Sequence, residues 1–460
     1  MIVYLVRPNY KSHLITPPLG LGYLSAFLKQ AGYKAKIIDG LNLGYNNDQL
    51  VEACKDADIV GISCLSDYFL ETIDLSKKLQ SKKKTVIIGG PHATALPDIT
   101  IAETGADFLV LGEGEQTLHE LIASLKNGSQ TNNIPGVYTL GAKHAEKRDF
   151  IKYLDELPFP DWEQLDPRTY KKAPHGGLVK SFPVAPIITT RGCPFECTFC
   201  ASPKLWNKTI RFRSPQNVIK EVKVLVNNYG VREIHFEDDN LTLKKSHIET
   251  ICNLIIENDL KINWATPNGI RVDTVTPELL ALMKKSGCYS IAFGIESGNQ
   301  DILDNIKKKT RLETIEYAIT EANKAGIVTQ GFFIFGLPGE TEESVRETVD
   351  FAKRTMLDKA QFLLLDVLPG SELWENLKGD FDIDWGRESY HEVSWVPNTM
   401  NKEVLQKAQA KAFRSFFLRP KQLLYFMRFF KLSQFAYITK RILDFGILSF
   451  HSNEKRGKHV

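Results

Sequence analysis

Short apolar runs alternate with amphipathic segments along the first 130 residues. The continuous apolar stretches have the length and composition of buried strands, and they lie at 2–6, 36–39, 58–63, 85–90 and 107–112. The segments between them, such as 17–32 and 68–81, carry apolar residues at helical spacing. This pattern predicts a doubly wound, Rossmann-like α/β domain with a parallel sheet covered by helices on both faces. Ligands of such sheets bind beyond the carboxyl ends of the strands.

A second series of strand and helix units begins near residue 183. Its six apolar runs lie at 184–190, 233–236, 262–266, 290–295, 329–335 and 360–365. The series predicts a partial (β/α)6 barrel of the TIM type, with its active site at the carboxyl ends of the strands. We therefore expect domains at 1–130 and 183–375, a linker or strap at 131–182, and a helical, basic C-terminal region at 376–460.

The strap contains a polar loop at 126–133, a short edge strand near 136–140 and the sequence Leu157-Pro-Phe-Pro-Asp-Trp162. Each proline keeps the residue before it extended, so this sequence is not helical. Two interpretations stay open for its aromatic residues. They cover the seam of the active site, or they belong to a plain linker packed on the surface.

The C-terminal region is strongly basic in a chain whose formal net charge is only +3. Residues 401–460 hold 13 Lys or Arg against 3 Asp or Glu, mixed with aromatic and aliphatic residues. A membrane-spanning helix needs about 18 uncharged residues, and no run reaches that length. A helix lying on a membrane surface and a helical cap on the barrel both fit the pattern. No nucleic-acid-binding module is recognisable, so we expect no nucleic acid partner.

Composition and cysteine usage indicate a globular protein of a reducing compartment. The 460 residues are 43% hydrophobic and 25% charged, with seven cysteines. Cys54, Cys64, Cys252 and Cys288 fall in strand or helix patterns, and we expect packed core thiols there rather than disulfides. The N-terminal apolar run is too short for a signal peptide. We expect a cytoplasmic protein, with membrane association as the open alternative.

Three cysteines stand close together directly after the apolar run 184–190. Cys193, Cys197 and Cys200 have the spacing C-x3-C-x2-C, and Gly192 and Pro194 supply the turn that points the sulfurs the same way. No fourth cysteine is nearby, so an iron–sulfur cube held here keeps one iron open for an outside ligand. A structural zinc knuckle with a missing ligand is the alternative.

The cysteine loop resembles the cluster motif of the radical SAM enzymes, including the aromatic Phe199 before the last cysteine. The resemblance implies a 4Fe-4S cluster on Cys193, Cys197 and Cys200. S-adenosylmethionine (SAM) then chelates the open iron and is cleaved reductively to a 5'-deoxyadenosyl radical. An external electron donor such as flavodoxin or ferredoxin is also implied.

Polar residues gather at the predicted carboxyl ends of the second series of strands. Burying them is costly unless they meet a charged ligand or one another. The resemblance assigns the acidic residues 237–239 to the amino group of SAM or its surroundings, Arg271 to the carboxylate, and Glu296 to the ribose or amino group. It assigns Gly336 to adenine. The residues expected to line the SAM pocket are Phe199, Glu237, Asp238, Asp239, Arg271, Glu296, Ser297 and Gly336.

Glycine-rich segments follow three strands of the first series, at 63–66, 89–94 and 112–115. Glycine lets a backbone approach a large flat ligand, and no G-x-G-x-x-G follows the first strand, so a dinucleotide is not expected. These segments resemble the cobalamin-binding domain that precedes the barrel in one radical SAM subgroup. The expected cobalamin-binding residues are Ser63, Leu65, Gly89, Gly90, Pro91, His92, Gly112, Glu113 and Gly114.

The D-x-H-x-x-G signature of a histidine-ligated cobalt is absent from the first strand-to-helix connection. We therefore expect the dimethylbenzimidazole tail to lie among these loops and the lower face to lack a histidine ligand. His92 follows a different strand and is expected to hydrogen-bond in the wall of the site. A degenerate domain that has lost the cofactor is the alternative.

The resemblance implies a cobalamin-dependent radical SAM enzyme that methylates an unactivated carbon of a small natural product or lipid-like substrate. The 5'-deoxyadenosyl radical removes a hydrogen atom, and methylcobalamin supplies the methyl group, so no side-chain base is required. The alternatives are a non-methylating oxidative cyclase of the same subgroup and a non-catalytic cobalamin or iron–sulfur redox sensor. A methylthiotransferase is disfavoured, because only Cys54 and Cys64 occur in the first domain and no barrel pattern follows residue 376.

Overall fold

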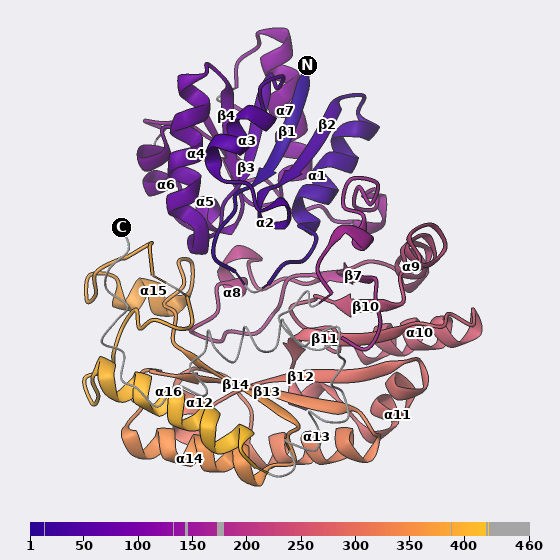
Figure 1. Ribbon diagram of the computed structural model, residues 1–460, viewed down its shortest axis with the longest axis vertical. Coiled ribbons are helices and arrows are strands. Elements are labelled where there is room, and N and C mark those ends of the chain that lie inside the picture. Colours follow the sequence, from indigo (N-terminus) through magenta and orange to yellow (C-terminus); the bar gives the residue numbers. More distant parts are fainter. Residues whose placement is uncertain are drawn as a thin grey trace.

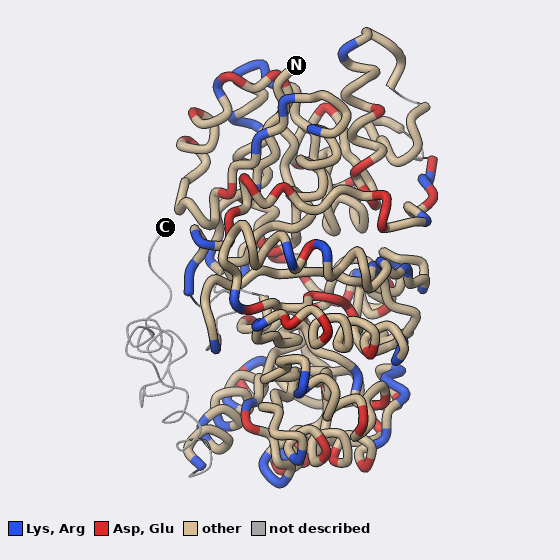
Figure 2. The backbone as a smooth tube through the Cα atoms, turned by 90° about the vertical axis from the view of Figure 1, so that its right-hand side faces the viewer, with Lys and Arg blue, Asp and Glu red and all other residues tan. Residues whose placement is uncertain are grey.

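The computed structural model describes residues 1–12, 14–131, 133–142, 146–172, 179–387, 389–419 and 422. Two six-stranded sheets, each with its own helices, are stacked along the long axis of the molecule (Figure 1). The first is the upper, indigo part of the view, and the second is the lower, orange part. Acidic and basic residues are interspersed over both (Figure 2). In the described part of the chain, no helix is long and apolar enough to cross a membrane.

The first sheet has the strand order β2-β1-β3-β4-β5-β6, with β6 as an antiparallel edge strand and all other pairs parallel. Its strands are mostly buried, as continuous apolar runs require. The predicted doubly wound sheet and its edge strand are confirmed. The strands are β1 (Ile2–Arg7), β2 (Lys34–Asp39), β3 (Ile59–Ser63), β4 (Thr85–Gly89), β5 (Phe108–Val110) and β6 (Val137–Tyr138).

Helices cover both faces of this sheet. One face carries α1 (Leu19–Gln30) and α7 (Gly114–Asn127), which contact each other. The other face carries α3 (Asn47–Ala53), α4 (Phe69–Ser81) and α6 (Pro97–Thr104). Shorter helices lie in the connections: α2 (Gly40–Leu43), the 3-10 turn η1 (Ser66–Tyr68) and α5 (Pro91–Ala95).

The second sheet is parallel throughout, in the order β14-β13-β12-β11-β10-β7, which confirms the predicted six-stranded partial barrel. Its strands are β7 (Val184–Ile187), β10 (Glu233–Phe236), β11 (Asn263–Ile270), β12 (Cys288–Glu296), β13 (Val328–Phe335) and β14 (Lys359–Leu364). Its helices are α9 (Pro215–Tyr229), α10 (Lys245–Glu257), α11 (Pro277–Lys285), α12 (Gln300–Asn305), α13 (Leu312–Lys324) and α14 (Glu342–Arg354), and a 3-10 turn, η4 (Val272–Thr274), precedes α11.

The strap fastens the two domains together. It contains the 3-10 turns η2 (Leu154–Glu156) and η3 (Pro167–Thr169). Asp161 accepts a hydrogen bond from Ser25 at 2.6 Å, and Gln164 accepts one from the Ile37 N–H at 2.9 Å, both on the first domain. The indole of Trp162 is only 3% exposed and donates to Glu221 on α9 at 2.9 Å. Trp162 therefore packs into the second domain, away from a surface position.

The chain after β14 forms α15 (Glu372–Leu377) and α16 (Lys402–Phe417). The α16 helix packs on β14, where Phe413 and Phe416 meet the ring of Phe362 edge-on. For residues 402–417, the structure therefore agrees with the helical cap on the barrel, one of the two interpretations of the C-terminal region. Residues 423–460, which carry the remaining aromatic and basic runs, lie outside the described residues.

Candidate active site

The three cysteines lie on a loop that a small hairpin closes at its base. The predicted strand 184–190 divides into β7 and a two-residue strand, β8 (Thr190–Arg191), which pairs antiparallel with β9 (Arg211–Phe212). The cysteine loop and α8 (Ser202–Leu205) fill the interval between them. Gly192 has φ +100°, and a Cβ there would clash with the carbonyl oxygen of Thr209. Glycine is therefore required where the loop leaves β8.

All three cysteines are free and partly accessible. Burial raises the pKa of the Cys193 thiol, and it raises that of Cys200 to about 12; negative charge on Cys197 adds to both effects. Among the described residues, no group of His, Cys, Asp or Glu could hold a single metal ion. An iron–sulfur cube does not need ligands that converge on a single ion, because each cysteine binds a different iron of the cube.

The cysteine loop is held from two sides by backbone hydrogen bonds of Thr198. Its N–H donates to Ile306 O at 3.1 Å, in the segment after α12, and its carbonyl accepts from Leu373 N–H of α15 at 2.9 Å. Thr198 is 4% exposed. The loop is therefore fixed between two cysteines, which favours a defined direction for both sulfurs.

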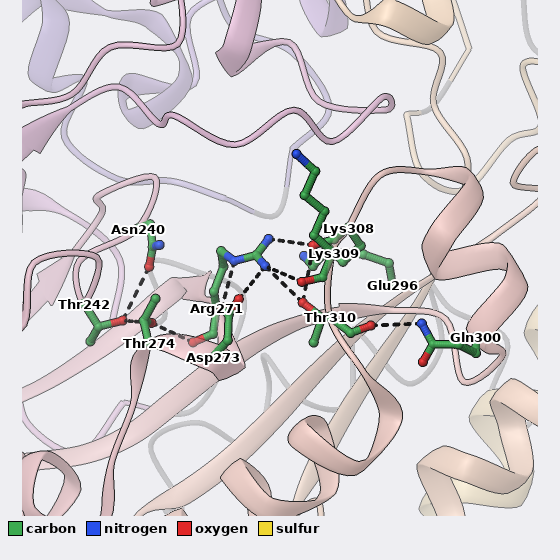
Figure 3. Close-up of polar contacts among 10 residues, drawn as sticks. All are labelled: Asn240, Thr242, Arg271, Asp273, Thr274, Glu296, Gln300, Lys308, Lys309 and Thr310. Carbon is green, nitrogen blue, oxygen red and sulfur yellow. Dashed lines mark hydrogen bonds and ion pairs between the residues drawn. The ribbon is translucent and has the colours of Figure 1, made fainter.

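Arg271 follows β11 and connects Asp273, the segment 308–310 and the Phe195 ring of the cysteine loop. Its guanidinium donates twice to Asp273, at 2.9 and 2.7 Å, and to the carbonyls of Lys308 and Lys309. The same group lies 3.8 Å from the centre of the Phe195 ring. Figure 3 shows Arg271 between Asp273 and the segment 308–310. Its donors are used within the protein, so the predicted contact with the SAM carboxylate would require Arg271 to exchange a partner.

Lys308 forms a buried ion pair with Glu296 at 2.6 Å, and the two side chains are 7% and 9% exposed. The ammonium lies 6.0 Å from the ring of Phe199, and negative charge on Glu296 and on Cys197 helps to raise the pKa of Lys308 against the opposing effect of burial. A Cβ on Gly294 would lie 2.7 Å from the Glu296 carboxylate and 3.0 Å from the Lys308 ammonium, so glycine makes room for the pair.

The sequence analysis did not single out Lys308, which is the middle residue of three consecutive lysines, 307–309. The structure shows that only the middle lysine of the three is buried. Ser297 was expected in the SAM pocket, but its hydroxyl lies 3.1 Å from Thr348 Oγ1 on α14 and accepts from the Asn299 N–H. Ser297 is fully buried and shapes the turn after β12.

The acidic segment after β10 divides into three different environments. Asp238 is 2% exposed, and one of its oxygens accepts from the Thr189 N–H and from the hydroxyls of Thr189 and Thr190. Burial raises the Asp238 pKa to about 6. Asp239 is exposed and accepts from Ser202 of α8 at 2.7 Å. Glu237 is half-buried, and its N–H donates to Ile187 O.

Gly336 follows β13 with φ +92°, and its N–H points to a buried carboxyl group. Glu340 is 0% exposed, and one of its oxygens accepts from the N–H groups of Gly336 and Leu337. Its other oxygen is buried and has no hydrogen-bond partner in the described part of the chain. Burial raises the pKa of Glu340 to about 8, which favours the neutral form of the group at pH 7.

The loops at the carboxyl ends of β3, β4 and β5 form the expected cobalamin side. Ser63 Oγ lies 3.2 Å from Tyr68 OH, Leu65 precedes η1, and Pro91 is the first residue of α5. Gly90 has φ +111°, and a Cβ there would lie 2.7 Å from Cys64 O, while Gly89 lies against Val110. Close backbone packing therefore requires glycine at position 90 and leaves little room for a side chain at position 89.

His92 is 1% exposed and shares a hydrogen bond of 2.9 Å with Ser66 through Nδ1. Phe69 and Trp385 enclose its ring at centroid distances of 4.1 and 4.8 Å, and burial lowers its pKa to about 4. Its Nε2 has no partner among the residues described. A neutral, enclosed imidazole with one open nitrogen fits a wall residue that hydrogen-bonds to a ligand.

The segment 112–115 contacts the hairpin at the base of the cysteine loop. Gly112 has φ +74° with open space around a Cβ position, and Gly114 begins α7 beside Leu24. Glu113 is among the residues expected at cobalamin, and its carboxylate accepts from Arg191 and Arg211 of the hairpin at 2.6 and 2.7 Å. Its carboxylate is committed to the interdomain contact.

The comparisons with known proteins cover both domains. Residues 187–352 match the Radical SAM superfamily, and residues 9–122 match the B12 binding domain. An uncharacterized methyltransferase of Pyrococcus horikoshii is 34% identical over 419 residues, which are 89% of this chain and 89% of that protein. The cytidylyl-2-hydroxyethylphosphonate methyltransferase of Streptomyces wedmorensis is 30% identical over 87% of this chain and 86% of its own length.

One solved structure shows the same fold over most of the chain. It is the radical S-adenosylmethionine methyltransferase TsrM of Kitasatospora setae, with cobalamin and a 4Fe-4S cluster bound. Its TM-score is 0.69 at 18% identity, and the match covers 90% of this chain and 81% of that one.

A doubly wound domain joined to an open barrel with three cysteines on one loop defines a radical SAM enzyme that carries a B12-binding domain. This chain belongs to that family, as its 34% identity over 89% of its length to the Pyrococcus horikoshii relative shows. The two domain families imply its cofactors, which are a 4Fe-4S cluster, SAM and cobalamin. The donor set fits them: three thiols for the cluster, buried charges for SAM, and loops packed through glycine for cobalamin.

Proposed function

We propose that this enzyme methylates an unactivated carbon of a small natural product or lipid-like substrate. When bound, SAM supplies the methyl group and the hydrogen-abstracting radical, and cobalamin carries the methyl group. The observation that supports this most directly is the contact between the cysteine loop's base, at Arg191, and the segment 112–115 of the B12-binding domain. Two relatives named as methyltransferases support it further.

The chain's own residues hold and orient the reactants. We propose that Glu296 binds the ammonium group of SAM and that Lys308 binds its carboxylate, in place of the role expected for Arg271. The buried pair is chemically matched to a zwitterion, because each of its charges can change partners without leaving a charge unpaired. Asp238 and the neutral Glu340 each keep one buried oxygen without a partner among the described residues. The Asp238 oxygen can accept from a bound hydroxyl or amine, and the protonated Oε1 of Glu340 can donate to a bound acceptor, because its Oε2 already accepts from two N–H groups.

The first experiment is anaerobic reconstitution with iron, sulfide and hydroxocobalamin, followed by reduction in the presence of SAM. We expect mass spectrometry to detect 5'-deoxyadenosine and S-adenosylhomocysteine, and both to disappear in the Cys193/Cys197/Cys200→Ala variant. 5'-Deoxyadenosine without S-adenosylhomocysteine, in enzyme loaded with cobalamin, would instead identify the non-methylating branch. We propose a flavodoxin or ferredoxin as the natural electron donor.

The SAM contacts are tested by equilibrium binding. Lys308→Met should weaken SAM binding about 10-fold or more, which is about 1.4 kcal/mol, because the carboxylate loses its charged partner. Lys307→Met is the matched control, since that neighbouring lysine is 47% exposed and pairs with Glu372. Equal affinities in the two variants would remove Lys308 from the SAM site and leave the proposed reaction standing.

A further inference from the structure

The cysteine hairpin contacts the B12-binding domain through a buried arginine on each of its strands, and Arg191 makes the larger contact. Arg191 Nη1 donates to Glu113 Oε1 at 2.6 Å, and Nη2 donates to Glu115 Oε1 at 2.7 Å. The guanidinium also lies 5.0 Å from the ring centre of Tyr23 on α1. All three charged residues are 9% exposed or less. Two carboxylates of one domain thus hold a single guanidinium of the other in a buried, directional contact.

The second strand of the hairpin joins the same contact. Arg211 lies opposite Arg191 in the β8–β9 pair, and its Nη1 donates to Glu113 Oε2 at 2.7 Å and to Ile151 O at 2.7 Å. The Ile151 N–H donates to Glu113 Oε2 at 2.8 Å. Glu113 therefore connects both strands of the hairpin with the strap.

The charges in this junction balance, with two arginines against two glutamates. Buried charges are retained only when they are paired, and the loss of one partner is strongly destabilising. The positions on either side are also informative. Glu113 and Glu115 flank Gly114 just after Gly112, where cobalamin is expected, and Arg191 is two residues before Cys193. A displacement of the segment 112–115 therefore moves the side chain of Arg191, which lies two residues before the first cysteine of the loop.

We propose that Arg191 is a positioning residue that couples the two cofactor sites of this enzyme. Through Glu113 and Glu115 it holds the cluster hairpin against the segment that follows β5. Cluster assembly and cobalamin binding then strengthen each other, because each orders one side of the same buried contact. The inference goes beyond the proposed reaction, since it depends on neither the substrate nor the fate of the methyl group.

The test measures coupling by binding. The dissociation constant of hydroxocobalamin is measured anaerobically in full-length protein with a reconstituted cluster and in the Cys193/Cys197/Cys200→Ala background. We expect the cluster to tighten cobalamin binding by about 5-fold or more, the lower end of common coupling between sites. In Glu113→Gln/Glu115→Gln the ratio of the two constants should fall to about 1. The single variant Glu115→Gln should give an intermediate ratio.

Glu375→Gln is the matched control. Its carboxylate pairs at 2.6 Å with Lys204 of α8, beside the cysteine loop, but the two side chains are 40% and 57% exposed. This variant should keep the wild-type ratio. A ratio near 1 in the wild type, or an unchanged ratio in the double variant, would overturn the proposal.

Hydrogen–deuterium exchange of the peptide 190–201 gives a second readout that needs no catalytic turnover. Hydroxocobalamin should slow exchange of this peptide in the wild type and in Glu375→Gln, and have less effect in Glu115→Gln. If the double variant fails to fold, the single variant decides the question by the same two measurements. Equal protection of the peptide in all three proteins would count against the coupling.

Discussion

At the scale of single residues, the clearest functional signal is a carboxyl group buried in its neutral form. The Glu340 pKa of about 8 lies above the ordinary value of 4.5 because burial disfavours the charged form. Between these two pH values the folded state binds a proton that the unfolded state has lost. Stability must therefore fall as pH rises through this window, by roughly 3 kcal/mol up to pH 7.

Glu340→Gln should remove much of this pH dependence. The amide oxygen can still accept from the N–H groups of Gly336 and Leu337, and no proton is bound or released. We expect calorimetry to show that the difference in melting temperature, variant minus wild type, becomes larger from pH 5 to pH 8. Glu343→Gln, whose side chain is 75% exposed, should follow the wild type at every pH. Parallel curves for Glu340→Gln and wild type would show that Glu340 titrates normally.

The residues that sequence reasoning missed share one property, which is that their burial depends on distant parts of the chain. Lys308 stands between two exposed lysines, and only the turn after α12 selects it to face Glu296. Arg191 and Glu115 look like ordinary charged residues until the two domains meet. The cysteine loop could be singled out from the sequence, because the C-x3-C-x2-C spacing is a local pattern, and the role of its three cysteines as cluster ligands stays a prediction. The contacts assigned by resemblance to SAM and cobalamin stay predictions.

At the scale of elements, the cluster loop depends on the geometry at its first residue. Gly192→Ala should prevent stable cluster binding, because a Cβ would both strain φ +100° and clash with Thr209 O. Gly230→Ala is the control, since Gly230 has φ +66° at the end of α9 with no atom of the described residues within 4 Å of a Cβ. Iron and sulfide content after reconstitution should fall in the first variant only. Equal loss in both would trace the effect to backbone strain alone.

Most strands were predictable because buried parallel strands are continuously apolar, as in β3, β4 and β12. The hairpin was not, because β8 and β9 contain two residues each and carry no periodic signal. The run 184–190 reads as one strand, yet the buried Asp238 binds the Thr189 N–H and both threonine hydroxyls. The acceptor, Asp238, follows β10, which is distant in the sequence. The sequence of the run 184–190 therefore gives no local signal for the break between β7 and β8.

At the scale of the whole molecule, the two domains should respond as one body to cobalamin. Buried contacts from Arg191, Arg211 and the strap join them. We expect one calorimetric transition that moves upward on adding hydroxocobalamin. At a free concentration 100 times the dissociation constant, the linkage contribution is about 2.7 kcal/mol. Trp162→Phe, which removes the hydrogen bond to Glu221, should broaden the transition. Two transitions in the wild type, with only one shifted, would show that the domains unfold independently.

The strap also sets an order of events while the ribosome makes the chain. Ser25, Ile37, Asp161 and Gln164 are all present once residue 164 has emerged, so the strap can dock on the first domain at once. Trp162 must wait, because its partner Glu221 comes 59 residues later. At typical synthesis rates of about 5–20 residues per second, this delay is roughly 3 to 12 s. During that interval the indole of Trp162 lacks its hydrogen-bond acceptor on α9, so the strap docks on the first domain before it docks on the second.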